Sequence, residues 1–396
     1  MAFSWDALKE VKCLAHSDVI PIQLFKEEDV NEVKGQRWPQ VQLGTQSKSK
    51  SMEFGGEESG ASGNAVTLNV ATTVYDWGRT RKTIDSRKLM EDAANKNIEA
   101  ELESIAYEVT STLVELGKQR ILVDVSQGFV VRMEEPVNML GGIVAVDQGR
   151  ASELTQAKAR LLQAQAARDS AQAKARDAEI NLNKLVGDRP VPIPRTKAWN
   201  IRLANLDVLL QRAADHPTVQ QVQAQAAAAE QQSGAIRASS LPQLNWGVSK
   251  STGKDELGRE RAWQTNLSMN WSVFSGGSTR ASERAARQRA EASRQDVDYQ
   301  RRDLEFHIRT SDHDARTMLE RAELYRDLSL ESDRIREAFF QQWYHLGKRT
   351  LLDVLIAGND YYGNQVSEIN NRFDGYQAIF RQYAGAGSLI SCLNGR

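Results

Sequence analysis

The segment "AWQTNLSMNWSVFSGG", residues 262–277, alternates strictly between apolar and polar side chains. One parity carries Trp263, Thr265, Leu267, Met269, Trp271 and Val273, and the other carries Gln264, Asn266, Ser268, Asn270 and Ser272. Because successive side chains of a strand point to opposite faces, the segment predicts a strand with one apolar face and one amide- and hydroxyl-lined face. In a soluble sandwich the apolar face packs into the core, whereas in a membrane barrel it meets lipid and the polar face lines water.

The composition of the chain excludes several classes of protein. Its 396 residues carry a formal net charge of −1, so no basic field favours a nucleic-acid partner. Mean hydropathy is −0.53, and apolar runs such as residues 351–358 are far shorter than the roughly 20 residues of a spanning helix. Two cysteines, Cys13 and Cys392, are too few for a disulfide-dense scaffold. They favour two unpaired thiols, with a single terminal bridge as the alternative.

The amino terminus raises a separate question. Residues 1–10, "MAFSWDALKE", lack the basic segment and the apolar stretch of about 7–15 residues that mark a secretory signal peptide. Either the protein is cytoplasmic or a start methionine stands in place of a removed signal, and we expect the second. Cys13 follows no apolar run, so it does not fit a lipid-attachment cysteine.

The two halves of the chain repeat the same motifs in the same order. The matched pairs are "RWPQVQLGT" (37–45) with "SLPQLNWGV" (240–248), "VYDWGRTR" (74–81) with "VFSGGSTR" (273–280), and "VDQGRASEL" (146–154) with "YHLGKRTLL" (344–352). The offset stays near 200 residues, which chance does not explain. We therefore expect a first structural repeat over residues 1–195 and a second over residues 196–396.

Each repeat predicts a short helix, a β-hairpin, a very long helix and a further helix. In the first repeat the hairpin, long helix and coiled-coil helix are expected at about 38–77, 80–146 and 150–187, followed by a linker. In the second repeat the hairpin and the two helices are expected at about 241–274, 280–346 and 348–384, followed by a C-terminal tail. Pro136 and the pair Gly141-Gly142 predict a kink or a break in the first long helix.

Four strands per chain cannot close a membrane barrel. The smallest membrane barrels have eight strands, and open sheet edges are not tolerated in lipid. Eight strands from two copies leave an interior filled by side chains, whereas about twelve strands from three copies leave a water-lined duct. We therefore expect a homotrimer. The alternative, a soluble β-sandwich edge with buried tryptophans, does not explain long helices attached directly to the hairpins.

The chain resembles the TolC-like family of outer-membrane efflux and secretion ducts, the outer membrane factors. The resemblance rests on the two-fold repeat, on the hairpin boundaries "LPQL" (241–244) and "FSGGSTR" (274–280), and most specifically on the turn "LGKRTLLDVL" (346–355). It implies a mainly α fold with a membrane β-barrel portion, in which a trimeric 12-stranded β-barrel continues into a 12-helix coiled-coil α-barrel tunnel built from two internal repeats. It also implies a location in the Gram-negative outer membrane, extending into the periplasm.

The resemblance assigns roles to both ends of the duct. The residues expected to face outer-membrane lipid are Trp246, Trp263, Leu267, Met269 and Trp271, with the polar parity facing water. The residues expected at the docking turns, which meet a periplasmic adaptor (membrane fusion) protein, are Gly149, Ser152, Gly347 and Thr350. Tyr344 and Arg349 fall on gate-linking positions of the family motif, and Asp353 falls on an inward-facing constriction acid. The alternative is that these three side chains only cap and solubilise a helix turn.

Two acids of the family pattern are not retained. Ile356 stands where a second inward acid would follow Asp353, and Thr155 stands where an acid often partners the arginine, with Glu153 two residues away. We therefore expect a gate with fewer polar links and fewer carboxylates, and so with weaker cation block and easier opening than a relative with two rings of acids.

No motif in the sequence indicates an enzyme. His307 and His313 share no helical face, and neither Cys-x-x-Cys nor His-Glu-x-x-His occurs. The glycines of "FSGGS" lack the strand, loop and lysine of a phosphate-binding site. We expect no catalytic residues, no metal site and no cofactor.

Three functions remain open at this point. The first is a passive outer-membrane exit duct for type I secretion, docked to an adaptor and an inner-membrane ABC transporter. The second is the exit duct of a multidrug or metal efflux pump. The third is a soluble coiled-coil scaffold without a pore, against which the alternation of the hairpins argues.

Overall fold

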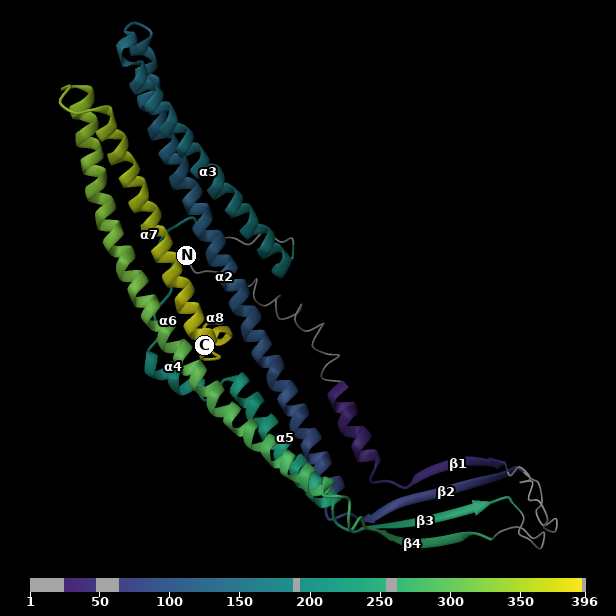
Figure 1. Ribbon diagram of the computed structural model, residues 1–396. Coiled ribbons are helices and arrows are strands. Elements are labelled where there is room, and N and C mark those ends of the chain that lie inside the picture. Colours follow the sequence, from purple (N-terminus) through teal and green to yellow (C-terminus); the bar gives the residue numbers. More distant parts are fainter. Residues whose placement is uncertain (1–24, 48–63, 188–192, 254–261, 394–396) are drawn as a thin grey trace. The chain divides into compact units, whose positions relative to one another are not determined.

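The computed structural model describes residues 25–47, 64–187, 193–253 and 262–393, which are mostly helical (Figure 1). The strands are β1 (Gln40–Ser47), β2 (Asn64–Tyr75), β3 (Gln243–Ser251) and β4 (Gln264–Asn270). The helices are 25–35, α2 (Arg79–Val144), the 3₁₀ turn η1 (Gln148–Arg150), α3 (Ala151–Val186), α4 (Leu206–Ala213), α5 (Pro217–Ser239), α6 (Ser278–Tyr344), α7 (Leu351–Gly385) and α8 (Leu389–Leu393).

Contacts divide the described chain into two compact units, and each unit takes segments from both expected repeats. The helical unit comprises residues 99–216 and 301–393, and the sheet unit comprises residues 25–98 and 217–300, apart from the undescribed residues.

In the sheet unit, the two hairpins join into one antiparallel sheet in the order β1-β2-β3-β4 (Figure 1). The central pair, β2 and β3, connects strands far apart in the sequence, with Val70 opposite Val248 and Thr72 opposite Trp246. In the described part of the chain, β1 and β4 each pair on one side only. The sheet therefore ends in two open edges.

The register of the strands sorts side chains by polarity. Directly opposed residues of antiparallel strands share a face, and the apolar partners include Leu43 with Leu68, Trp246 with Leu267, and Leu244 with Met269. The opposite face carries pairs such as Asn69 with Ser249, Gly247 with Asn266, and Asn245 with Ser268. The apolar face is not a core in the single chain, because Leu43 is 74% exposed and Met269 is 68% exposed.

The return strand of the second hairpin is shorter than the alternation suggests. β4 ends at Asn270, so Trp271 and Val273 lie beyond it. The indole Nε1 of Trp271 instead donates a hydrogen bond to the carbonyl oxygen of Ser240, at 3.3 Å, where α5 leads into β3. Trp271 thus lies outside the sheet, and its side chain contacts the connection between α5 and β3.

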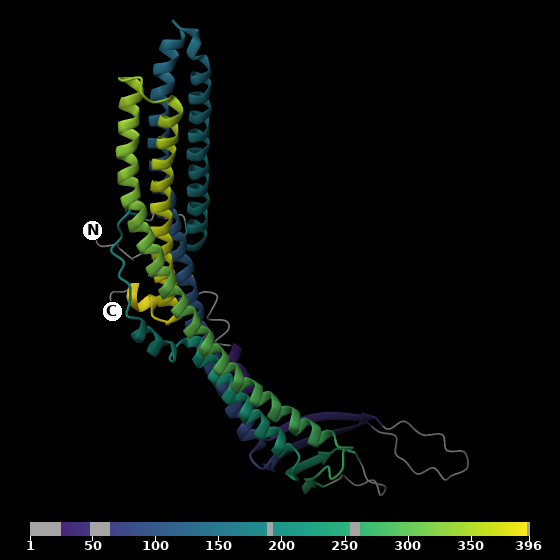
Figure 2. The same ribbon diagram turned by 60° about the vertical axis from the view of Figure 1, so that its left-hand side comes forward.

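In the helical unit, α2 with α3 and α6 with α7 form two antiparallel helical hairpins (Figures 1 and 2). α3 buries one alanine in every seven residues, and these are Ala157, Ala164, Ala171 and Ala178. Such a period is typical of coiled-coil packing at close approach. α2 runs without interruption through Pro136, so the break expected there does not occur. Pro136 removes only one backbone donor from a helix that packing holds on both sides of it.

The segment between α3 and α4 is fixed against α7. Trp199 is 7% exposed, and its ring lies 5.2 Å from that of Phe373 and 6.1 Å from that of Tyr376. Lys197 Nζ forms an ion pair with Glu368 Oε2 at 2.9 Å. A Cβ added at Gly117 of α2 would lie 2.5 Å from Trp199 Cζ2, so the indole depends on that glycine for its position.

Two glycine substitutions should therefore change the free energy of unfolding in opposite directions. Gly117→Ala should lower it by about 1–3 kcal/mol, because the new methyl group overpacks the site of Trp199. Gly363→Ala in α7 should raise it by about 0.5–1 kcal/mol, because the helix loses a glycine and the methyl group meets no atom within 4 Å. Urea unfolding followed by circular dichroism measures both, and equal effects would contradict this packing.

Candidate functional site at the helical turns

The two helical hairpins place their turns at the same end of the helical unit (Figures 1 and 2). In the first turn, the Asp147 side chain accepts a hydrogen bond from the backbone N–H of Gly149, at 2.9 Å, and so caps η1. In the second turn, α6 ends at Tyr344 and α7 begins at Leu351 after the cap residue Thr350. The expected docking residues Gly149, Ser152, Gly347 and Thr350 all lie on these turns.

The two turn glycines are not equivalent. Gly347 has φ +61°, in the left-handed region that favours glycine, and a Cβ there would meet no atom within 4 Å. Gly149 has no such backbone angle, but a Cβ there would lie 3.1 Å from Asp147 Oδ1. A substitution at Gly347 therefore strains the backbone, whereas one at Gly149 crowds the cap.

Thr350 and Asp353 form a reciprocal capping box at the start of α7. The Asp353 N–H donates to Thr350 Oγ1 at 3.3 Å, and Asp353 Oδ2 accepts from the Thr350 N–H at 3.2 Å and from its hydroxyl at 3.0 Å. Such a box pairs backbone donors that a helix terminus otherwise leaves free. One oxygen of the expected constriction acid thus has a structural role.

The expected gate residues Tyr344 and Arg349 do not meet Asp353. Arg349 Nε donates to Gln342 Oε1 at 3.2 Å, and its guanidinium lies 4.2 Å from the centre of the Phe339 ring. Tyr344 is half exposed, with its ring 4.7 Å from that of His345. Arg349 is therefore held to α6, within its own helical hairpin.

The contact between the two turns uses residues that the sequence analysis did not select. Arg150, the last residue of η1, forms an ion pair with Glu153 at 2.7 Å. Its guanidinium lies 5.9 Å from the centre of the Trp343 ring. Trp343 is 6% exposed, near the end of α6. Thr155, at the position of a missing family acid, donates its hydroxyl to the Ala151 carbonyl. A tryptophan next to a predicted turn was the sequence feature that could have indicated this contact.

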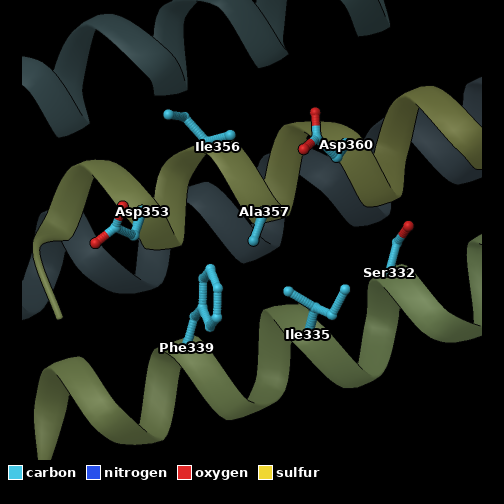
Figure 3. Close-up of a pocket in the computed structure, with 7 residues that line it drawn as sticks. All are labelled: Ser332, Ile335, Phe339, Asp353, Ile356, Ala357 and Asp360. Atoms are coloured by element: carbon cyan, nitrogen blue, oxygen red, sulfur yellow. The ribbon is translucent and has the colours of Figure 1, made fainter. Parts of the chain in front are cut away.

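A cleft between α6 and α7 brings a second carboxylate near Asp353 (Figure 3). It has a volume of about 120 Å³, and its walls are Ser332, Ile335 and Phe339 from α6 and Asp353, Ile356, Ala357 and Asp360 from α7. Asp360 follows Asp353 by two turns, a spacing that keeps two side chains on one helix face. The family pattern places the second acid at the position of Ile356, whereas the second acid at this cleft is Asp360.

The sheet unit carries the residues expected to meet lipid. Trp246, Leu267 and Met269 share the apolar face, and Trp263 and Trp271 flank β4 with 61% and 54% exposure. Two further exposed tryptophans flank the sheet and were not selected, Trp38 before β1 and Trp77 after β2. Trp77 Nε1 donates to the Pro242 carbonyl at 2.7 Å. Their position at the ends of predicted strands was the sequence feature that could have placed them with the residues expected to meet lipid.

The described residues hold no further site of the kinds considered for the sequence. No group of three His, Cys, Asp or Glu side chains there is arranged to hold a metal ion. No helix among them is long and apolar enough to cross a bilayer. Cys392 is a free thiol, and Cys13 lies outside the described residues.

Thr350→Ala should destabilise the first turn of α7, because the reciprocal cap is lost, at a cost of about 1 kcal/mol. Ser152→Ala is the matched control, since Ser152 is exposed in the first turn of α3 and the cap residue of that helix, Arg150, makes no capping hydrogen bond with its side chain. Amide hydrogen exchange over residues 351–356 should quicken in the first variant only. Equal exchange in both variants would contradict the cap.

Comparison with known proteins gives both sequence and fold matches. Residues 208–381 match the family model described as outer membrane efflux protein. No curated protein is significantly similar to the chain in sequence.

Three solved structures illustrate the likeness in fold. The outer membrane protein VceC of Vibrio cholerae has a TM-score of 0.83 at 16% identity, covering 96% of this chain and 95% of that chain. The CmeC outer membrane channel of Campylobacter jejuni has a TM-score of 0.81 at 16% identity, covering 97% and 86%. The open state of the MtrE outer membrane channel of Neisseria gonorrhoeae has a TM-score of 0.79 at 16% identity, covering 97% and 89%. Residues 208–381 are thus similar to the outer membrane efflux protein family, and the chain has the fold of these solved outer-membrane channels.

Proposed function

We propose that the protein is a passive exit duct that works as a homotrimer with one shared barrel. The observation that carries the proposal is the sheet, which has an exposed apolar face, a polar face and two open edges in the described chain. Lipid does not tolerate open edges, and three copies joined edge to edge would give a closed barrel of about twelve strands. Closure would leave the amide- and hydroxyl-lined face around water.

The two faces of the sheet then have different neighbours. Trp246, Leu267 and Met269 face lipid, while Asn266 and Ser268 face the water-filled interior. Trp38, Trp77 and Trp271, at the strand ends next to the helices, have the place of an aromatic girdle at the lipid–water boundary. The register and the exposure of these side chains support this assignment.

The helical turns are the proposed contact with the rest of the export machinery. Gly149, Ser152, Gly347 and Thr350 would meet the tip of a periplasmic adaptor, which connects the duct to an inner-membrane transporter. Ser152 and Thr350 are exposed and small, which supports close approach of another helix.

Two cargo classes remain candidates. Type I secretion, with an ABC transporter as the inner-membrane partner, is the function proposed first. Export of small compounds by a multidrug or metal pump is favoured by the description of the matching family as efflux proteins. Expression in a strain that lacks its own ducts distinguishes them, because secretion restores a polypeptide in the medium and efflux lowers the cellular content of a fluorescent dye.

Leu267→Arg should prevent assembly, because a charge near the bilayer midplane costs about 2–4 kcal/mol in each chain. Ser268→Arg should still give a trimer, with altered conductance, because its side chain faces water. The mass of the detergent-solubilised protein and its conductance in planar bilayers measure the two effects. A stable wild-type monomer, or equal tolerance of both substitutions, would contradict the shared barrel.

We also propose that Tyr344, Arg349 and Asp353 set the resting state of the duct at its periplasmic end. A trimer would bring three Asp353 carboxylates around one axis, and like charges at short range favour bound cations. In the single chain Arg349 contacts Phe339 and Gln342. It therefore does not pair with the Asp353 oxygen that lies outside the capping box. Asp360 adds a second carboxylate on the same helix face.

Asp353→Asn and Asp360→Asn should each weaken block by a trivalent cation in planar bilayers, and the double variant should weaken it most. Each single variant removes three negative charges from the proposed trimer. Ile356→Asn is the matched control, since it changes polarity at the same cleft without changing charge. Unchanged block in the double variant would move the cation site elsewhere.

A further inference from the structure

Tyr361 of α7 lies beneath two guanidinium groups, one from each neighbouring long helix. The Arg132 guanidinium of α2 lies 5.2 Å from the ring centre, and the Arg336 guanidinium of α6 lies 5.6 Å from it. Both distances are within the range of cation–π attraction. A single ring thus connects three helices of the helical unit.

The next residue strengthens the connection to α2. The Tyr362 ring stacks on that of Phe129, with centres 4.3 Å apart and planes 6° apart. Its hydroxyl is 2.9 Å from Ser126 Oγ. Consecutive tyrosines therefore fasten α7 to α2, and Tyr361 also contacts Arg336 of α6.

The two arginines differ in how their charge is balanced. Arg336 forms an ion pair with Asp333 at 2.7 Å on its own helix. Arg132 Nε and Nη2 are buried and find no hydrogen-bond partner among the described residues. Burial lowers the pKa of Arg132. The ring of Tyr361 and the charge of the Asp333 carboxylate compensate this guanidinium in the described chain, and the charge of Arg336 opposes them.

Arg132 and Tyr361 have opposite effects on the stability of the contact between α2 and α7. Arg132 is a half-buried cation, and its two buried donors without hydrogen bonds disfavour the packed arrangement, since water would solvate them better. The aromatic ring recovers part of this loss, because guanidinium N–H groups interact favourably with a ring face. Tyr361 should therefore stabilise the contact of α7 with α2, and Arg132 should destabilise it.

We propose that Arg132 is a positioning residue that keeps the resting contact between α2 and α7 easy to release, with Tyr361 as the residue that holds it. The inference rests on the proposed function as a duct, and it includes the separation of α7 from α2 when the duct opens. When α7 moves away from α2, water again solvates the Arg132 guanidinium. This gain in solvation free energy favours the open state.

Two substitutions separate this role from ordinary packing. Arg132→Met keeps the length of the side chain and removes the charge, so it should lower the open probability of the trimer in planar bilayers at least fivefold. It should also raise Tm. Tyr361→Leu should raise the open probability at least fivefold and lower Tm. In the Arg132→Met background, Tyr361→Leu should have a much smaller effect, because the two residues act through one contact.

Arg309→Met, a change of an exposed arginine on α6, controls for loss of surface charge and should alter neither measurement. A fall in Tm in both Arg132→Met and Tyr361→Leu would overturn the proposal, because both residues would then be simple packing contacts. If Tyr361→Leu fails to fold, the sign of the Arg132→Met effect decides alone. A wild-type protein that forms no conducting trimer would contradict the proposed function, whereas Tm of Arg132→Met still tests the inference.

Discussion

The apolar face of the β1–β4 sheet has no cover within the described chain, and most of the architecture follows from that exposure. Exposed Leu43, Leu267 and Met269 would form an aggregation-prone surface in water. The strand ladder is equally incomplete, because β1 and β4 each have an unpaired side there. In the proposed trimer, a bilayer together with further copies of the chain would satisfy both needs at once. The sheet thus sets the environment in which the long helices have to work.

The helical unit solves a different problem, which is to hold long helices together with little apolar side-chain volume. α3 uses alanine in every seventh position, so backbones approach closely while little is buried per residue. Polar and aromatic contacts also hold the helices in place, as where Trp199 and Lys197 contact residues of α7. The helices near the turns are held by Phe129, Trp343 and Leu355. Such an interface permits rearrangement more readily than a core of large interlocking side chains.

The periodicity of the sequence predicted much of this arrangement, and the reasons for its failures are local. Alternation along 262–277 identified the strand and its two faces, because a two-residue period is visible in the sequence itself. It could not show that Trp271 leaves the ladder for the Ser240 carbonyl. Pro136 suggested a break, but tertiary packing carries α2 across it. At the turns, family motif positions selected Asp353 but not its capping bond to Thr350, and they missed Asp360, Arg150 and Arg132. Those roles depend on which helices become neighbours.

The pairing of β2 with β3 has a consequence for how the protein reaches its folded state. Val66 N donates to Thr252 Oγ1, a residue 186 positions later in the chain. The first hairpin is therefore made long before its neighbour is synthesised, and β2 presents an open edge throughout that interval. Contacts of such large sequence separation form slowly, and waiting edges are templates for wrong pairing. The β2 edge is consequently the part of the first hairpin most open to wrong pairing until β3 is synthesised.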